Sequence, residues 1–238
     1  MKEQLKDIGE KTIGELVAED YRVAKVFEQL GIDFCCGGNV ALSAACAEKG
    51  IHLELVLGEI EEAKSALVER DQNFSAWDLS FLADYIVNNH HSYINETSGK
   101  LAAYCDKVAS VHGGNHPEVI EIAGLFLSVA SELASHLREE EEVLFPAVKR
   151  AEGAVKAGGQ PEGSDRETIN GCIALVHEHE KVGDAIHTIR SLSKDYALPG
   201  DACNTFMLTY RMLREFEDDI HKHVHLENNI LFPKATRL

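Results

Sequence analysis

Apolar and polar residues follow a helical pattern along most of the chain, and no segment shows the sustained alternation that is typical of a strand. The longest stretches predict four helices, which cover about residues 79–110, 118–151, 167–194 and 201–229. Segments rich in glycine and proline separate them, for instance Pro199 and Gly200 before the fourth helix. Because the connections between the long helices are short, we expect an up-down-up-down four-helix bundle.

A smaller helical region precedes the bundle. Its helix-like segments cover about residues 20–30, 40–49 and 52–69, and Thr12 and Glu15 form the T-x-x-E pattern of a capping box. A turn at about residues 33–39 contains two adjacent cysteines, Cys35 and Cys36, and residues 71–76 have the polar character of a linker. The sequence therefore predicts an all-α protein, with a small helical domain at residues 1–70 and a four-helix bundle at residues 77–238.

Charge and composition exclude several classes of function. The formal net charge of −17 argues against nucleic-acid binding and disfavours anionic membrane surfaces. No apolar run approaches the roughly 18 residues of a membrane span, and the first residues do not resemble a signal peptide. We therefore expect a cytoplasmic protein, in which the six cysteines are mostly reduced. Free, buried thiols are expected at Cys46, Cys105, Cys172 and Cys203.

One sequence pattern occurs twice, as H-x3-E-x2-[VI]-L-F-P, beginning at His136 and at His223. In each copy the imidazole and the carboxylate, Glu140 or Glu227, lie one helical turn apart on the same face. The first copy has four consecutive glutamates, but only Glu227 is acidic in the second, which selects Glu140. Both histidines follow the apolar stripe of their helix, so we expect them in the bundle interior, where such groups need partners. Two such pairs in one bundle predict a metal site.

The other two bundle helices each offer two candidate histidines. His179 has apolar neighbours on its face, whereas His177 is surrounded by charged residues, which favours His179. His90 likewise shares its face with apolar residues, whereas His91 lies close to two asparagines, which favours His90. The predicted metal ligands are His90, His136, Glu140, His179, His223 and Glu227.

Four imidazoles and two carboxylates inside a helical bundle suit two non-haem iron ions. Both carboxylates can bridge the metals, and coordination positions stay open for an oxo or hydroxo bridge and a small ligand. Structural zinc favours a closed tetrahedral set, and magnesium or calcium favours oxygen ligands, while manganese stays open as an alternative. Pro146 and Pro233 are expected to end or kink their helices just beyond the metal.

The six predicted ligands resemble those of a hemerythrin-like di-iron domain, and the segment G-I-D-F-C-C-G-G at residues 31–38 looks like the signature of the small domain fused to it. Together they are similar to the RIC (repair of iron centres) family of iron-sulfur cluster repair proteins, also called YtfE, ScdA or DnrN. The resemblance implies a bacterial protein of nitrosative and oxidative stress. Such a protein would restore damaged iron-sulfur proteins, by donating iron, and would react with nitric oxide. Oxygen-carrying hemerythrins use five histidine ligands, and the four matched here argue against reversible oxygen carriage.

The adjacent cysteines Cys35 and Cys36 are the candidate catalytic residues. Neighbouring side chains cannot easily chelate one tetrahedral metal, and a disulfide between them would be strained and easily reduced. A helix beginning near Asn39 would direct its N-terminal dipole at these thiols and lower their pKa. A transient iron ligand or a redox relay is the functional interpretation, and two buried thiols in a turn is the structural one.

Other functions use the same residues. Reduction of nitric oxide at two ferrous ions would make the chain an enzyme, and reversible binding of oxygen or nitric oxide would make it a sensor or carrier. A bundle whose buried histidines and glutamates only hydrogen-bond is the fourth alternative. The electron donor stays unidentified, and a homodimer stays open.

Overall fold

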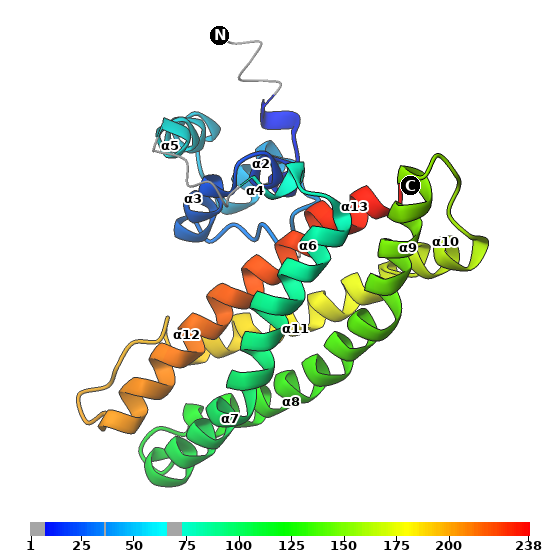
Figure 1. Ribbon diagram of the computed structural model, residues 1–238. Coiled ribbons are helices and arrows are strands. Elements are labelled where there is room, and N and C mark those ends of the chain that lie inside the picture. The colour runs from blue at the N-terminus through cyan, green and yellow to red at the C-terminus, as the bar shows by residue number, and fades with distance from the viewer. Residues whose placement is uncertain (1–7, 36, 66–72) are drawn as a thin grey trace. The chain divides into compact units, whose positions relative to one another are not determined.

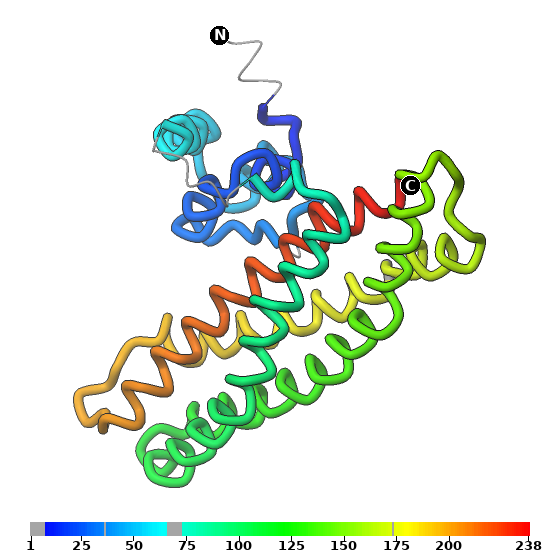
Figure 2. The backbone as a smooth tube through the Cα atoms, viewed as in Figure 1, coloured from blue at the N-terminus to red at the C-terminus, as the bar shows by residue number. Residues whose placement is uncertain are grey.

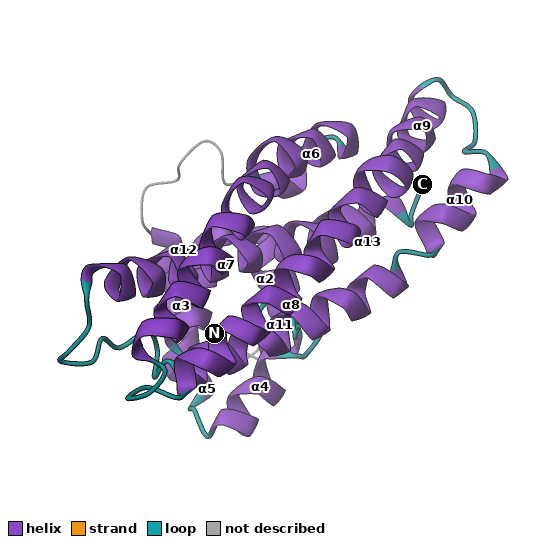
Figure 3. Cartoon of the chain, turned by 90° about the horizontal axis from the view of Figure 1, so that it is seen from below, coloured by secondary structure: helices purple, strands orange, loops and turns teal. Residues whose placement is uncertain are grey.

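The computed structural model describes residues 8–35, 37–65 and 73–238, and the regular elements in these ranges are all helical (Figure 3). An isolated backbone bridge between Thr12 and Ala41 is the single extended pairing among them. The described chain divides into two compact units, one formed by residues 1–82 with 224–237 and the other by residues 83–223 with 238. The predicted all-α class is therefore confirmed.

The first unit contains short helices (Figure 1), and apolar residues such as Leu16 and Phe27 are buried in it. Thr12 caps α2 as predicted, because its hydroxyl accepts the backbone N–H of Glu15 while the Glu15 carboxylate accepts the N–H of Thr12. Gly31, with φ of +64°, follows α3 and lets the chain turn away. Its elements before the bundle are α2 (Ile13–Glu19), η1 (Tyr21–Val23), α3 (Ala24–Gln29), α4 (Leu42–Lys49), α5 (Leu53–Ser65) and η2 (Phe74–Ala76).

The second unit is the helical bundle, in which four long helices follow one another in alternating directions (Figures 1 and 2). α8 packs against both α7 and α11, and the ring of Phe216 on α12 contacts Phe126 on α8 and Tyr93 on α7. The long helices are α7 (Ser92–His112), α8 (Glu118–Glu139), α11 (Ile173–Leu192) and α12 (Asn204–His225).

The predicted third helix is in fact two helices. α10 (Gly163–Asn170) ends before the turn at Gly171 and Cys172, and α11 begins only at Ile173. The helical pattern on either side of Gly171 is continuous in sequence, so it did not reveal this break.

Three bundle helices contain a π-helical segment. α6 (Leu79–Ile86) continues through η3 (Val87–His91) into α7, and α8 continues through η4 (Glu140–Leu144) into α9 (Phe145–Lys156). α12 continues through η5 (Leu226–Leu231) into α13 (Phe232–Ala235). Pro146 and Pro233 are the second residues of α9 and α13, so of the two expected effects, an end or a kink, the end of the helix is wrong. A π-helical segment ends two residues before each proline, which has no backbone N–H to donate.

By length and composition, one helical stretch of the described chain, Glu118–Lys156, could cross a membrane. It consists of α8, η4 and α9. Its apolar residues include Phe126, Val129 and Leu133, which are buried in the bundle, and the buried Glu140 lies in its middle. The core helix of a globular bundle meets the same criteria.

Candidate metal centre

Four imidazole rings and a carboxylate gather inside the bundle. They come from five elements, of which α8 and η4 form one continuous helix. Each side chain is at most 4% exposed. They are His91 on η3, His136 on α8, Glu140 on η4, His179 on α11 and His223 on α12.

The imidazoles form two pairs that face each other through their Nε2 atoms. The Nε2 atoms of His136 and His179 are 2.8 Å apart, and those of His91 and His223 are 3.2 Å apart. Two donors bound to one transition metal at about 2.0–2.2 Å lie about 3 Å from each other. Both separations therefore suit two ligands of the same ion.

Glu140 lies between the two pairs. Its Oε1 is 3.3 Å from Nε2 of His136, and its Oε2 is 3.4 Å from Nε2 of His91. Both oxygens are buried, and neither accepts a hydrogen bond from any residue that the structure describes. A buried carboxylate without hydrogen bonds is costly, and a cation is the partner that relieves the cost.

Glu227 follows His223 by one turn on the same continuous helix, as Glu140 follows His136. The donor atoms form two groups, and within each group all lie within 4.8 Å of one another. Both groups contain Glu140 and Glu227, while the imidazoles divide into His91 with His223 and His136 with His179. Each group is able to hold a metal ion, and the shared carboxylates suit bridging ligands.

His91, and not the predicted His90, lies in this cluster. His90 is also buried, but its Nδ1 pairs with Oδ1 of Asp219 at 2.9 Å. The reason is the π-helical segment Val87–His91, which adds a residue to the turn and rotates the following side chains. An α-helical periodicity extrapolated through this segment therefore selects the residue one position too early.

Two carboxylates outside the cluster fix the orientation of two rings. Nδ1 of His91 pairs with Oε1 of Glu141 at 2.9 Å, and Nδ1 of His136 pairs with Oε2 of Glu178 at 2.8 Å. A carboxylate partner favours the tautomer with the proton on Nδ1, which leaves Nε2 for a metal. Sequence reasoning missed both residues, since Glu141 stands in an acidic run typical of a solvated face. Their positions beside the predicted ligands Glu140 and His179 were the available signal.

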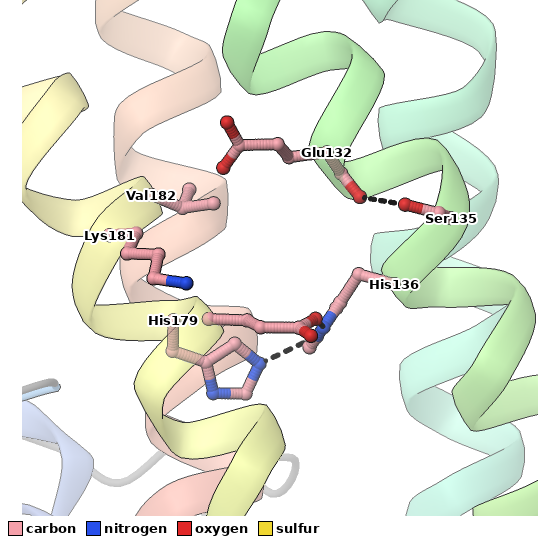
Figure 4. A pocket seen from close by; sticks show the side chains of 7 residues that line it. Glu132, Ser135, His136, His179, Lys181 and Val182 are labelled. Carbon is pink, nitrogen blue, oxygen red and sulfur yellow. Dashed lines mark hydrogen bonds and ion pairs between the residues drawn. The ribbon is translucent and has the colours of Figure 1, made fainter.

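A pocket of about 220 Å³ opens onto one of the two histidine pairs (Figure 4). Its lining includes Glu132 and His136 from α8 and His179, Lys181 and Val182 from α11. A pocket therefore borders the centre on the side of His136 and His179.

The candidate catalytic cysteines belong to the first unit, and Cys36 lies outside the described residues. The thiol of Cys35 is buried, and it donates a hydrogen bond to Oδ1 of Asp33 at 3.1 Å. The same carboxylate accepts the backbone N–H groups of Cys35 and Gly37. α4 begins only at Leu42, so the expected helix N-terminus at Asn39 is wrong.

The loop that carries Cys35 packs against η5 and the end of α12 within the first unit. The amide Nδ2 of Asn229 donates to the carbonyl oxygen of Phe34 at 3.1 Å and lies 3.1 Å from Nδ1 of His225. Burial lowers the pKa of His225 to about 3, so this imidazole is neutral. A Cβ on Gly14 or Gly38 would come within 2.8 Å of Asn229, which explains glycine at both positions.

Comparison with known proteins agrees with both parts of this architecture. A hemerythrin HHE cation-binding domain matches residues 82–235, and a domain of unknown function, ScdA_N, matches residues 9–64. The iron-sulfur cluster repair protein ScdA of Staphylococcus haemolyticus is 34% identical over 94% of this chain and 97% of its own length. The repair protein YtfE of Pectobacterium carotovorum is 30% identical over 96% and 97%. A probable iron-sulfur cluster repair protein of Haemophilus influenzae is 28% identical over 95% and 96%.

These matches cover nearly the whole chain, and the buried His and Glu cluster falls inside the cation-binding domain. The chain therefore belongs to the ScdA and YtfE family of iron-sulfur cluster repair proteins.

Proposed function

We propose that this protein is a di-iron protein that repairs iron-sulfur clusters damaged by nitrosative or oxidative stress, and that it does so by supplying iron. One observation carries the proposal: two groups of buried donors share two carboxylates, and each group adds two imidazoles. Relatives that align over nearly their full length carry the name of iron-sulfur cluster repair proteins. The cytoplasm is the proposed location, and damaged iron-sulfur proteins are the proposed partners.

In this proposal His91 and His223 hold one iron and His136 and His179 hold the other. Glu140 and Glu227 each contribute to both. The mixed nitrogen and oxygen donors suit iron in either of its common oxidation states, so a redox change can alter how tightly it is held. Glu141 and Glu178 keep the protons of His91 and His136 on Nδ1. Protonation of Nε2 would compete directly with metal binding.

The position of the pocket favours release of one of the two proposed irons before the other. His136 and His179 line it, whereas His91 and His223 do not. A competing ligand, such as a thiolate of a damaged cluster site, would reach the iron held by His136 and His179 first. We therefore expect one iron to leave more readily than the other.

Iron quantitation on protein purified without oxygen tests the proposal directly. Two irons per chain are expected, and Glu140→Ala and Glu227→Ala should each abolish or severely reduce them. Glu139→Ala is the matched control, because Glu139 is exposed and adjacent in sequence to Glu140. The loaded protein should restore activity to an iron-sulfur enzyme inactivated by nitric oxide, and full iron content in both Ala variants would refute the ligand assignment.

Cys35 and Cys36 are proposed to act in repair and not in assembling the centre. The double variant Cys35→Ala, Cys36→Ala should keep two irons per chain while losing most of its repair activity. A variant with full activity and full iron content would remove this role and leave the cysteines as structural thiols.

Reduction of nitric oxide is the second candidate function, because the pocket gives a small ligand access to His136 and His179. The measurement is nitrous oxide formed per chain in the presence of an electron donor. Many turnovers with no loss of iron would favour the reductase over the repair function.

A further inference from the structure

A second cluster of possible ligands lies in the bundle outside the centre described above. It consists of His187 on α11 and Glu217 and His221 on α12, and one donor atom of each lies within 4.8 Å of the others. Glu217 and His221 are four residues apart, so both side chains project from the same face of α12. His187 faces them from the neighbouring helix, and its ring centroid lies 5.8 Å from that of His221.

Glu217 is fully buried, and its two carboxylate oxygens have different surroundings. Oε2 accepts a hydrogen bond from the hydroxyl of Tyr196 at 2.7 Å and lies 3.2 Å from Nε of Arg190. Oε1 is buried without a hydrogen-bond donor among the residues that the structure describes. It lies 3.9 Å from Nε2 of His221, a separation that two ligands of one ion can adopt.

The loop after α11 positions the hydroxyl of Tyr196 to donate its hydrogen bond to Glu217. Lys194, Asp195 and Tyr196 all have positive φ, between 52° and 58°, which is unusual for three consecutive residues with side chains. Burial raises the pKa of Tyr196, and the nearby Glu217 carboxylate raises it further. The hydroxyl of Tyr196 therefore stays protonated and remains a donor. The orientation of Glu217 is therefore fixed, with Oε2 engaged and Oε1 presented to the two histidines.

His187 is exposed, so the cluster reaches solvent on one side. A bound ion would have three protein ligands and water at its remaining positions. Two imidazoles with one carboxylate favour a divalent transition metal over magnesium or calcium, which prefer oxygen ligands.

We propose that His187, Glu217 and His221 bind one divalent transition-metal ion, at a mononuclear site separate from the centre formed around Glu140. The alternative is a purely structural network in which Glu217 serves only Tyr196 and Arg190. That network accounts for Oε2 but leaves Oε1 buried without a donor from the described part of the chain. The proposal does not rest on the repair function.

Titration of the iron-loaded protein with Co²⁺ tests the site, because the visible absorption of Co²⁺ reports its ligands. One Co²⁺ per chain should bind while the iron content stays constant. His187→Ala should weaken this binding at least about tenfold, as should His221→Ala. His177→Ala is the matched control, since His177 is an exposed histidine of the same helix that pairs with Glu180, and it should leave binding unchanged.

Three results would overturn the proposal. The first is that no Co²⁺ binds to the iron-loaded protein. The second is that binding is unaffected by His187→Ala and His221→Ala, or is weakened equally by His177→Ala. The third is that iron is released in proportion to the Co²⁺ taken up, which would place the ion in the other centre.

Discussion

The Nε2 atoms of His136 and His179 lie 2.8 Å apart, although the two residues belong to different helices. Because Glu178 favours the proton of His136 on Nδ1, Nε2 of His136 presents a lone pair to its neighbour. Without a cation, His179 must supply a proton to this contact. With a cation, both nitrogens would serve as ligands, and Glu140, whose Oε1 lies 3.3 Å from Nε2 of His136, would join them.

Metal removal is therefore expected to destabilise the protein through this cluster. At a metal concentration of about 100 times the dissociation constant, binding contributes roughly 2.7 kcal/mol to the free energy of unfolding. A chelator should lower the unfolding temperature of the wild type but have little effect on Glu140→Gln. Thermal unfolding with and without chelator measures both, and Glu139→Gln should behave as the wild type. An equal response of Glu140→Gln and the wild type would contradict the assignment.

His90 and His91 are predicted to have different roles. His91→Ala should lose at least one iron per chain, because it removes a ligand facing His223. His90→Ala should keep its iron but lose about 1–3 kcal/mol of stability, because Asp219 is left without its buried partner. Iron content and denaturant unfolding of the two variants separate the roles. Iron loss in His90→Ala with full iron in His91→Ala would restore the ligand predicted from sequence.

The outer carboxylates should tune affinity without being ligands. Glu141→Gln and Glu178→Gln are each expected to weaken metal binding by about 10- to 100-fold, the usual effect of removing the partner of a ligating imidazole. Competition with a chelator of known affinity measures the change. Glu180→Gln is the control, because Glu180 pairs with the exposed His177. Unchanged affinity in the two test variants would show that the ring orientation is set by other contacts.

Cys203 should react with alkylating reagents near neutral pH. The expectation that Cys203 is buried is wrong, because the residue is exposed, and its Sγ lies 3.2 Å from Nε2 of His112. A hydrogen bond from the backbone N–H of Phe206 and, to a smaller extent, one from His112 lower the pKa of Cys203 to about 7. The thiolate fraction therefore rises as the pH increases through 7. The rate at which iodoacetamide modifies Cys203, measured by mass spectrometry, should rise with pH, with a midpoint at about 7.

Two comparisons check the Cys203 prediction within the same experiment. His112→Ala should move the midpoint of the rate to higher pH. Cys105, where burial raises the pKa to about 12, should stay unmodified in the folded protein. Equal rates at Cys203 and Cys105 would show that the environment of Cys203 does not activate it.

The sequence predicted much of the fold because helical periodicity and capping are local. The four long helices and the Thr12 capping box depend on residues within a few turns of each other. The H-x3-E pattern identified His136 with Glu140 for the same reason, and its repetition at His223 was the one signal that linked two helices distant in sequence. What it could not show depends on partners distant in sequence. Glu178 resembles a solvated residue until α11 is packed against α8, and Cys203 lacks a partner until His112 is brought beside it.

The π-helical segment Val87–His91 has a consequence for protein engineering. The extra residue of the π-helical turn determines the direction in which every later side chain of α7 points. Deletion of a single residue there would rotate each of these side chains by about 100° around the helix axis. Such a deletion would exchange the two adjacent imidazoles while shifting the apolar seam of the helix out of register. The chelating geometry and the hydrophobic seam are thus encoded by the same backbone irregularity, and a design that idealises the helix would lose both.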